Sequence, residues 1–449
     1  MKKEKLGSGA KSTLRKASRK AVEDSVLVVK RHLQQARWLG TNNRYQEDTI
    51  ARLKVDSRHG RAPSHGPLRQ YITASAPLHC ADGWMLLGRA VDCHARRDQD
   101  SARHFAYYAE LRAAMSLLAA EGIGVFSGNN FVVDKQQKCQ RFGGGTHWVT
   151  WRALEYWAEL KRASDLLGTS FRISGIALQD WVDQFPAGSS LRPVGSTWLN
   201  MWGLDLRIFS EDEEARNEAS YRPTTLRQRP TLDVSQCLDF MCSLWSLCEP
   251  SALSPFGTLD RQLLRLAVEG IFEGKNGPIS GGKQAHFASD VSKMLSLVFA
   301  DPLTQQEWLN FLTRATEPND SIVLREARGK DSIASPNQHL QMISRAALLL
   351  RTATAASARL LAKGDVSMED VRFWWSAMGE DRGFWEDGNS PAYLGDMWAD
   401  VEMAIQGMQA WSAQTEGADR TFLRWRKDRS YEIALLGGCE RIALWGLEP

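Results

Sequence analysis

The sequence predicts a mainly α-helical protein made of two helical bundles, and two observations lead to this prediction. Apolar residues recur at helical spacing over long stretches, as in the one-sided stripe that begins with Phe105, Tyr108 and Leu111. Polar residues and glycines that suit helix ends stand at the borders of these stretches. The chain of 449 residues also exceeds the ~250–300 residues at which a single hydrophobic core usually stops growing, so we expect two domains.

The N-terminal half carries the clearest local signals. Short β-branched and aromatic runs predict a small β-hairpin near 124–134. Gly122 ends the preceding helical stripe, and Thr146, after a run of three glycines, is expected to cap the next helix. Helices are expected in this half over about 26–36, 50–53, 103–120 and 146–160.

A proline-rich interval separates the two predicted domains. Between Pro186 and Asp233 the chain holds four prolines and an acidic run that is followed by arginines, which places the boundary near residue 225. The predicted organisation is a basic N-terminal arm (1–25), an N-terminal helical domain (26–225) and a C-terminal helical domain (226–449).

The C-terminal domain is expected to be a series of helices. The spacing of apolar residues predicts them at about 235–248, 259–273, 284–299, 304–316, 338–363, 368–378 and 395–414. Thr304 and Glu307 match a capping box, and Ser367 precedes two acidic residues in a first turn. The tail, 431–445, has two open interpretations: a pair of short strands around Gly437, or a broken helix.

Cysteine usage and hydropathy bear on the compartment. Seven cysteines are an odd number spread thinly over a long chain, which is unlike the dense disulfide frameworks of small secreted proteins. No apolar run approaches the ~18–20 residues that cross a bilayer, and the basic start lacks the apolar middle of a secretory signal. We therefore expect a cytoplasmic protein with no membrane partner.

The positive charge is concentrated at the N-terminus. The first 20 residues carry a net charge of +7 and the whole chain +3, so the other 429 residues sum to −4. Such a segment can neutralise phosphates and bind RNA or DNA without sequence preference, while the alternative is a solvated, partly frayed leader. The basic residues are Lys2, Lys3, Lys5, Lys11, Arg15, Lys16, Arg19 and Lys20.

Arg141 and His147 form a candidate catalytic pair. Arginine can hold a scissile phosphate through two hydrogen bonds, and histidine can take the proton of an attacking 2′-hydroxyl without any metal. The alternative is that Arg141 is an ordinary surface residue and that His147 packs against Trp151.

The segment around this pair resembles the HEPN superfamily of small helical domains. The resemblance covers about residues 103–160 and rests on RHFAYYAELRAAMSLLAAEGIGV, which is similar to the first long helix of the family, and on RFGGGTH at 141–147. Members place an arginine, four to six residues and a histidine at the start of a helix, and they occur in bacterial toxin and phage-defence proteins. The resemblance implies a metal-independent ribonuclease, with a site composed across a two-fold dimer interface, or a non-catalytic binding protein. Phe142 stands where the family often has a polar residue.

Aromatic residues rimmed by acids occupy the region 373–398. This composition is typical of a protein-binding surface, and it also fits a loop that tucks its rings into its own core. The candidate partner-binding residues are Trp374, Trp375, Phe384 and Trp385.

Two other patterns fall short of known sites. The stretch from Gly277 to Lys283 copies most of a phosphate-binding loop, but Gln284 replaces the hydroxyl residue that binds magnesium. The pairs His79–Cys80 and Cys93–His94 lack the spacing of a zinc site. We therefore expect no metal and no cofactor.

The sequence leaves two classes of function open. We favour a non-enzymatic helical subunit of a multi-protein assembly, in a bacterial anti-phage defence or toxin module, that contacts nucleic acid through its basic segment. The alternative is a HEPN-type ribonuclease that uses Arg141 as phosphate anchor and His147 as general base, as a homodimer.

Overall fold

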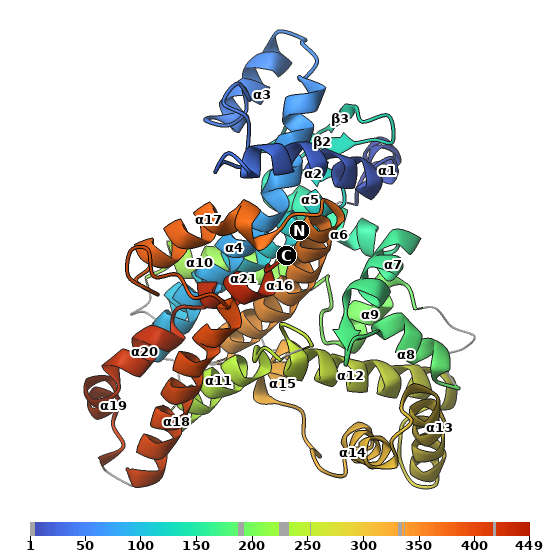
Figure 1. Ribbon diagram of the computed structural model, residues 1–449, viewed down its shortest axis with the longest axis vertical. Helices are drawn as coiled ribbons and strands as arrows, with labels where there is room; N and C mark the ends of the chain where they lie inside the picture. The colour runs from blue at the N-terminus through green and yellow to red at the C-terminus, as the bar shows by residue number, and fades with distance from the viewer. Residues whose placement is uncertain are drawn as a thin grey trace.

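The computed structural model describes residues 5–186, 193–223, 233–251, 253–330, 335, 337–415 and 419–449. Helices dominate these ranges (Figure 1), which confirms the prediction of a mainly α-helical fold. No helix within them is long and apolar enough to cross a membrane. In chain order the α-helices are α1 (Ser8–Arg15), α2 (Arg19–Leu33), α3 (Thr49–Arg58), α4 (His65–Ala95), α5 (Gln99–Ala120), α6 (Thr146–Ala158), α7 (Lys161–Ser170), α8 (Leu178–Gln184), α9 (Gly195–Met201), α10 (Phe209–Tyr221), α11 (Val234–Leu247), α12 (Gly257–Asn276), α13 (Lys283–Val298), α14 (Pro302–Leu312), α15 (Ile322–Ala327), α16 (Gln338–Lys363), α17 (Met368–Asp381), α18 (Trp398–Gln414), α19 (Phe422–Asp428), α20 (Ser430–Leu436) and α21 (Glu440–Gly446).

The centre of the molecule consists of the three long helices α4, α5 and α16, which pack against one another. Small residues let their backbones approach closely. The Ser116 hydroxyl of α5 donates to the Ala76 carbonyl of α4 at 2.7 Å and contacts the Ser357 hydroxyl of α16 at 3.1 Å. A Cβ atom on Gly83 of α4 would lie 2.5 Å from Leu350 of α16, so only glycine fits there without movement.

This packing joins the two predicted domains. α16 belongs to the predicted C-terminal domain, yet it packs on α4 and α5 of the predicted N-terminal domain. Buried apolar residues from both halves form one continuous cluster. A boundary near residue 225, which itself lies outside the described residues, therefore does not separate two cores. The expectation of two domains was based on chain length. The described residues instead share one helical core, which is larger than a single core usually is.

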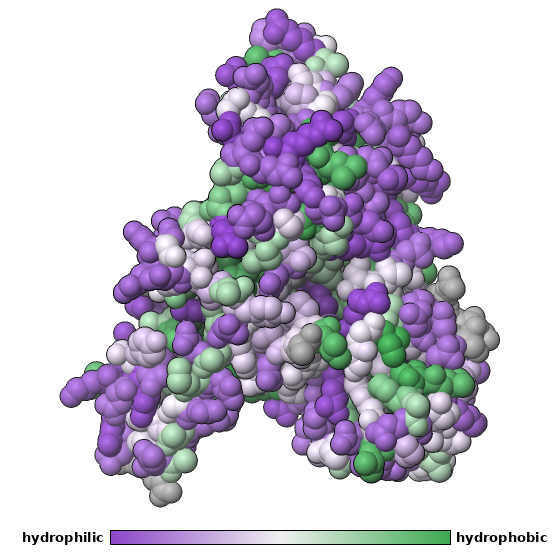
Figure 2. All heavy atoms as spheres, viewed as in Figure 1, coloured by the Kyte–Doolittle hydropathy of each residue, from purple (hydrophilic) through white to green (hydrophobic). Residues whose placement is uncertain are grey.

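Three lobes extend from this core (Figure 1). The upper lobe contains α1, α3 and the strands β2 and β3, the lower right lobe contains α8 and α12 to α14, and the lower left lobe contains α18 to α20. Figure 2 shows a hollow between the two lower lobes and mostly hydrophilic residues over the upper lobe.

The predicted hairpin near 124–134 is present as part of a small antiparallel sheet. Strands β1 (Ile123–Gly124), β2 (Asn130–Val133) and β3 (Cys139–Phe142) pair in the order β1-β2-β3. Phe131 pairs with Arg141 across β2 and β3. A second pair of short strands, β4 (Arg172–Ile173) and β5 (Ile176–Ala177), lies between α7 and α8.

A buried ion pair links the core to α10. Arg345 of α16 donates from Nε and Nη2 to the carboxylate of Asp212, at 2.9 and 2.6 Å, and both side chains are at most 2% exposed. Glu110 of α5 is fully buried, with its Oε1 atom 3.9 Å from Nε of Arg345. One guanidinium therefore stands between two buried carboxyl groups.

Glu110 is expected to make the stability depend on pH. Burial and the neighbouring Asp212 charge raise the pKa of Glu110 well above its ordinary value of 4.5, against the opposing effect of Arg345. A raised pKa favours the folded state at low pH, and this contribution is lost as the pH rises above 4.5 toward the folded pKa. We expect the free energy of unfolding of wild type to fall relative to that of Glu110→Gln as the pH rises above 4.5, measured in urea titrations at a series of pH values. Parallel curves for the two proteins would contradict this expectation.

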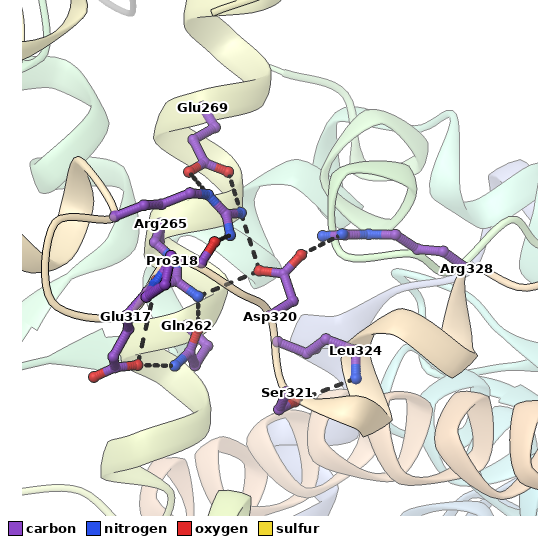
Figure 3. A network of polar contacts seen from close by, with 10 residues as sticks. Gln262, Arg265, Glu269, Glu317, Pro318, Asp320, Ser321, Leu324 and Arg328 are labelled. Carbon is purple, nitrogen blue, oxygen red and sulfur yellow. Dashed lines mark hydrogen bonds and ion pairs between the residues drawn. The ribbon is translucent and has the colours of Figure 1, made fainter. Parts of the chain in front are cut away.

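A polar network fastens α12 to the segment between α14 and α15 (Figure 3). Asp320 accepts from Arg265 at 3.2 Å, from Arg314 at 3.0 Å and from Arg328 at 2.6 Å. Arg314 also binds Glu269 of α12 through two hydrogen bonds, at 2.5 and 2.7 Å. This network holds the segment between α14 and α15 against α12, because each charge in it has an opposite partner.

Three predictions for the C-terminal half can be compared with the structure. The tail forms the helices α20 and α21 around Gly437 and contains no strands, so the broken helix is the right interpretation. The capping box predicted at Thr304 is wrong, because Asp301 caps α14 by accepting from the Thr304 amide at 2.8 Å. The two acidic residues expected after Ser367 lie in the first turn of α17, and Ser367 caps this helix in a capping box that Asp370 completes.

Candidate nucleic-acid interface

The basic N-terminal segment is not an extended arm. Its described residues form α1 and the start of α2, and Leu6 and Leu14 are buried against the body, with Leu14 fully covered. Ser18 caps α2 by accepting from the Ala21 amide. The segment therefore presents its charges from a fixed helix, because the apolar positions of α1 pack inward.

The predicted basic residues have different environments. Lys2 and Lys3 lie outside the described residues, while Lys5 and Lys11 are exposed. Arg19 is part-buried, and its Nε atom contacts Glu121 at 2.5 Å. Lys20 pairs with Asp24 one turn along α2. Arg15 and Lys16 are exposed and bind neutral partners, the Tyr156 hydroxyl at 3.3 Å and the Gln140 side chain at 3.0 Å, so their charges are uncompensated by these contacts.

Strand β3 brings two further groups of basic residues next to α1. Lys16, the C-cap residue of α1, donates to Gln140 of β3, and the neighbouring Arg141 donates to the Ser57 hydroxyl of α3 at 2.5 Å. β3 is thus contacted by α1 and by α3, which are far apart in the sequence. We call the exposed cations of α1, α3, β3 and the turn before β3 the basic surface: Lys11, Arg15, Lys16, Arg52, Lys54, Arg58, Lys135, Lys138 and Arg141.

The carboxylates within these elements are buried and engaged. Asp56 of α3 binds Arg44 at 2.9 Å, and Asp134 accepts from the amides of Gln136 and Lys138 at 3.0 and 2.9 Å. Both acids are therefore used inside the fold. The exposed charge of the basic surface is left strongly positive, which is the electrostatic footprint of a polyanion-binding protein.

A glycine-rich loop joins the basic surface to the start of α6. Gly143 and Gly145 have no heavy atom near the place of a Cβ, and Gly144 has φ +125°, a conformation that favours glycine. No side chain caps α6, and in the described ranges the amides of Thr146 and His147 have no acceptor. Free amides at a helix start, next to open glycines, are a common place for a phosphate group.

Arg141 and His147 are held by different elements. Arg141 lies on β3 and turns to Ser57 of α3, whereas the Nδ1 atom of His147 lies 2.6 Å from the hydroxyl of Tyr107 on α5. Trp151 donates from Nε1 to the same hydroxyl at 3.3 Å. The structure places His147 half-buried beside this aromatic pair and places Arg141 in the basic surface.

The surroundings of His147 favour its neutral form. Burial, and then the charge of Arg216, lower the pKa of His147 below its ordinary value of 6.5. The Arg216 guanidinium lies over the Tyr107 and Tyr108 rings, 5.0 and 5.5 Å from their centroids. A neutral imidazole can act as a proton acceptor. Arg141, however, contacts Ser57 of α3 and not His147.

The aromatic residues predicted to bind a partner pack within the chain. Trp375 is 2% exposed, and Trp374 lies against it and against Trp38, with ring centroids 3.9 and 4.9 Å away. Arg441 covers the ring of Phe384 at 4.0 Å. Trp385 fills the space beside Gly379, where a Cβ would lie 2.0 Å from its ring. Trp375 is buried, but Trp374, Phe384 and Trp385 are only half-buried, so the binding of a partner by these rings stays a prediction.

The histidine and cysteine pairs also serve the core. His79 binds Arg112 at 2.8 Å, and Cys80 contacts the Thr354 hydroxyl at 3.2 Å. His94 and His339 contact each other at 3.0 Å. Within the described ranges no group of three or more histidine, cysteine or acidic residues has the arrangement of a metal site.

Comparisons with known proteins identify no relative. No protein-family model, no curated protein and no solved structure matches this chain significantly. The HEPN resemblance therefore stays a prediction.

The sequence pointed to part of this interface. The charge of residues 1–20 and the prominence of Arg141 were visible as local patterns. The cations of α3 and of the turn before β3 were missed because they are scattered along the chain. The signal that could have found them is the excess of bases over acids between residues 49 and 61.

Proposed function

We propose that this protein is a helical nucleic-acid-binding protein whose basic surface holds the phosphate backbone of RNA or DNA. The observation that carries the proposal is the assembly of nine exposed cations from separate segments around β3, with the carboxylates of the same elements buried. Cations that no carboxylate neutralises attract a polyanion and release its counterions on binding.

The type of contact follows from the chemistry of the surface. Lysine and arginine side chains and free helix amides recognise phosphate oxygens, which carry no sequence information. The binding is therefore expected to be strongly salt-dependent and tolerant of sequence. The glycine-rich loop before α6 would let a phosphate approach the backbone closely.

The ribonuclease alternative has less support than binding. Its two residues contact different elements, and Arg141 is one of nine cations rather than a partner of His147. Its test is the substitution His147→Ala, which would abolish RNA cleavage if the alternative holds. The expected protein partners, including a second copy of the chain, and the role in anti-phage defence stay predictions.

Fluorescence anisotropy with labelled single-stranded RNA, single-stranded DNA and duplex DNA tests the proposal. We expect the triple variant Lys11→Gln, Arg15→Gln, Lys16→Gln to bind at least roughly tenfold more weakly than wild type at low salt. We also expect the slope of log affinity against log salt to fall by about three, roughly one for each cation that no longer meets a phosphate.

A matched control changes the same charge elsewhere. Arg424, Arg426 and Lys427 are exposed on α19 in the lower left lobe, and their triple glutamine variant is expected to keep the wild-type affinity. Equal losses in both variants would mean that only net charge matters. That result, or the absence of binding by wild type at low salt, would overturn the proposal.

A further inference from the structure

A second candidate site lies in the lower right part of the molecule, at a cavity of about 330 Å³ between the β4–β5 hairpin and the turn that precedes α12. Arg172 of β4 and Arg261 of α12 both line it, together with the side chains of Ser251 and Thr258 and the ring of Trp308. None of these residues belongs to the basic surface around β3.

Arg261 is a half-buried cation that forms no ion pair with the described residues, and the carboxylates of Glu317 and Glu307 act on it only from beyond ion-pair distance. Its guanidinium lies over the rings of Phe311 and Trp308, 3.9 and 5.0 Å from their centroids. Its Nε atom is sealed from solvent and has no hydrogen-bond partner among the described residues. In the described part of the chain no carboxylate lies within ion-pair distance of Arg261, in contrast to Arg265 one turn along α12, which contacts Asp320 (Figure 3). A partly desolvated guanidinium gains most from an anion.

The rest of the lining favours the same charge. Arg172 donates from Nε to the Gly175 carbonyl at 3.2 Å and makes no ion pair within the described ranges. Glu249 is the one carboxylate in the lining, and its Oε2 atom accepts from the Thr258 hydroxyl at 3.4 Å. The two arginines therefore leave the cavity with a net positive charge. Ile173 and Leu253 add an apolar wall.

We propose that this cavity binds a small organic anion, with Arg261 and Arg172 holding its phosphate or carboxylate group and the apolar wall covering its body. A volume of about 330 Å³ suits a compact ligand, at the lower end of the size of small-molecule pockets. The proposal does not depend on nucleic-acid binding by the basic surface.

Isothermal titration calorimetry of the full chain with phenyl phosphate, phenylacetate and inorganic phosphate tests it. We expect saturable binding of at least one of the two organic anions to wild type. Arg261→Gln is expected to weaken that binding at least roughly tenfold, because the loss of a charged hydrogen bond has about this effect. Inorganic phosphate is expected to bind more weakly, because it lacks an apolar body.

Two further variants keep the test decisive. Arg172 is exposed, so Arg172→Gln is expected to weaken the binding of the same anion without changing the packing of the core. This variant therefore tests the proposal even if Arg261→Gln fails to fold. Arg372→Gln, an exposed residue of α17 that pairs with Glu369, is the matched control and keeps wild-type affinity. The α1 triple variant separates the two proposals, since it should lose nucleic acid but bind the anion normally.

The inference would be overturned by a lack of saturable binding to wild type, by unchanged binding in Arg172→Gln, or by an equal loss of binding in the Arg372→Gln control. An oligonucleotide could also displace the anion from wild type but not from the α1 triple variant. That result would assign the anion to the basic surface and would contradict the inference.

Discussion

Replacing Arg345 with methionine is expected to lower the free energy of unfolding by about 3–5 kcal/mol. The substitution removes the guanidinium that binds Asp212 through two hydrogen bonds and lies 3.9 Å from Glu110. Both carboxyl groups would remain in the core without a cation, and a buried charge without a partner has to be neutralised or solvated at large cost. Urea unfolding followed by circular dichroism measures the change.

The exposed pair Arg372–Glu369 provides the control for this experiment. Its side chains are 62% and 76% exposed, so Arg372→Met is expected to change the free energy of unfolding by no more than about 0.5 kcal/mol. If Arg345→Met were as stable as Arg372→Met, the buried pair would not hold α10 to α16 as the structure indicates.

Replacing Gly88 with alanine is expected to destabilise the protein by about 3 kcal/mol. A Cβ atom at this position of α4 would lie 2.3 Å from the Gly437 carbonyl oxygen and 2.8 Å from the Cys439 amide nitrogen. Both atoms belong to the backbone between α20 and α21, so the whole C-terminal segment would have to move. Thermal or urea unfolding of the variant measures this cost.

Gly66, in the first turn of the same helix, is the matched control. No heavy atom lies within 4 Å of its Cβ position, so Gly66→Ala is expected to keep or slightly raise the stability, because alanine favours the helix by up to ~1 kcal/mol. Both variants replace glycine with alanine in the same helix, and their expected effects on stability have opposite signs. A stable Gly88→Ala protein would show that α4 and the C-terminal segment are not in contact there.

Helix positions in the C-terminal half could be predicted closely from the sequence. The helix predicted at 338–363 has those bounds in α16, because its apolar residues recur at helical spacing and a glycine, Gly364, stands at its C-cap. α4 was missed although it is the longest helix of the described ranges. Apolar and small residues lie all around it, so it shows no one-sided stripe, and Pro77 in its interior is a residue that usually ends a helix.

The candidate interface was predictable only in its local part. The contact of Arg141 with Ser57 joins residues 84 positions apart, and no pattern within either segment indicates it. The same holds for the anion cavity, since Arg172 and Arg261 belong to segments that meet only in the folded chain. Long-range neighbours are set by the packing of α4, α5 and α16, which sequence periodicity does not specify.

The shared core has a consequence for the synthesis of this protein. Ser116 and Ser357 meet in the central helices although 241 positions separate them. While the ribosome is still translating the region before α16, α4 and α5 have no final partner for their inner faces, and these apolar faces stay open to chaperones or to aggregation. Truncation before α16 should therefore yield an insoluble product rather than a smaller working unit.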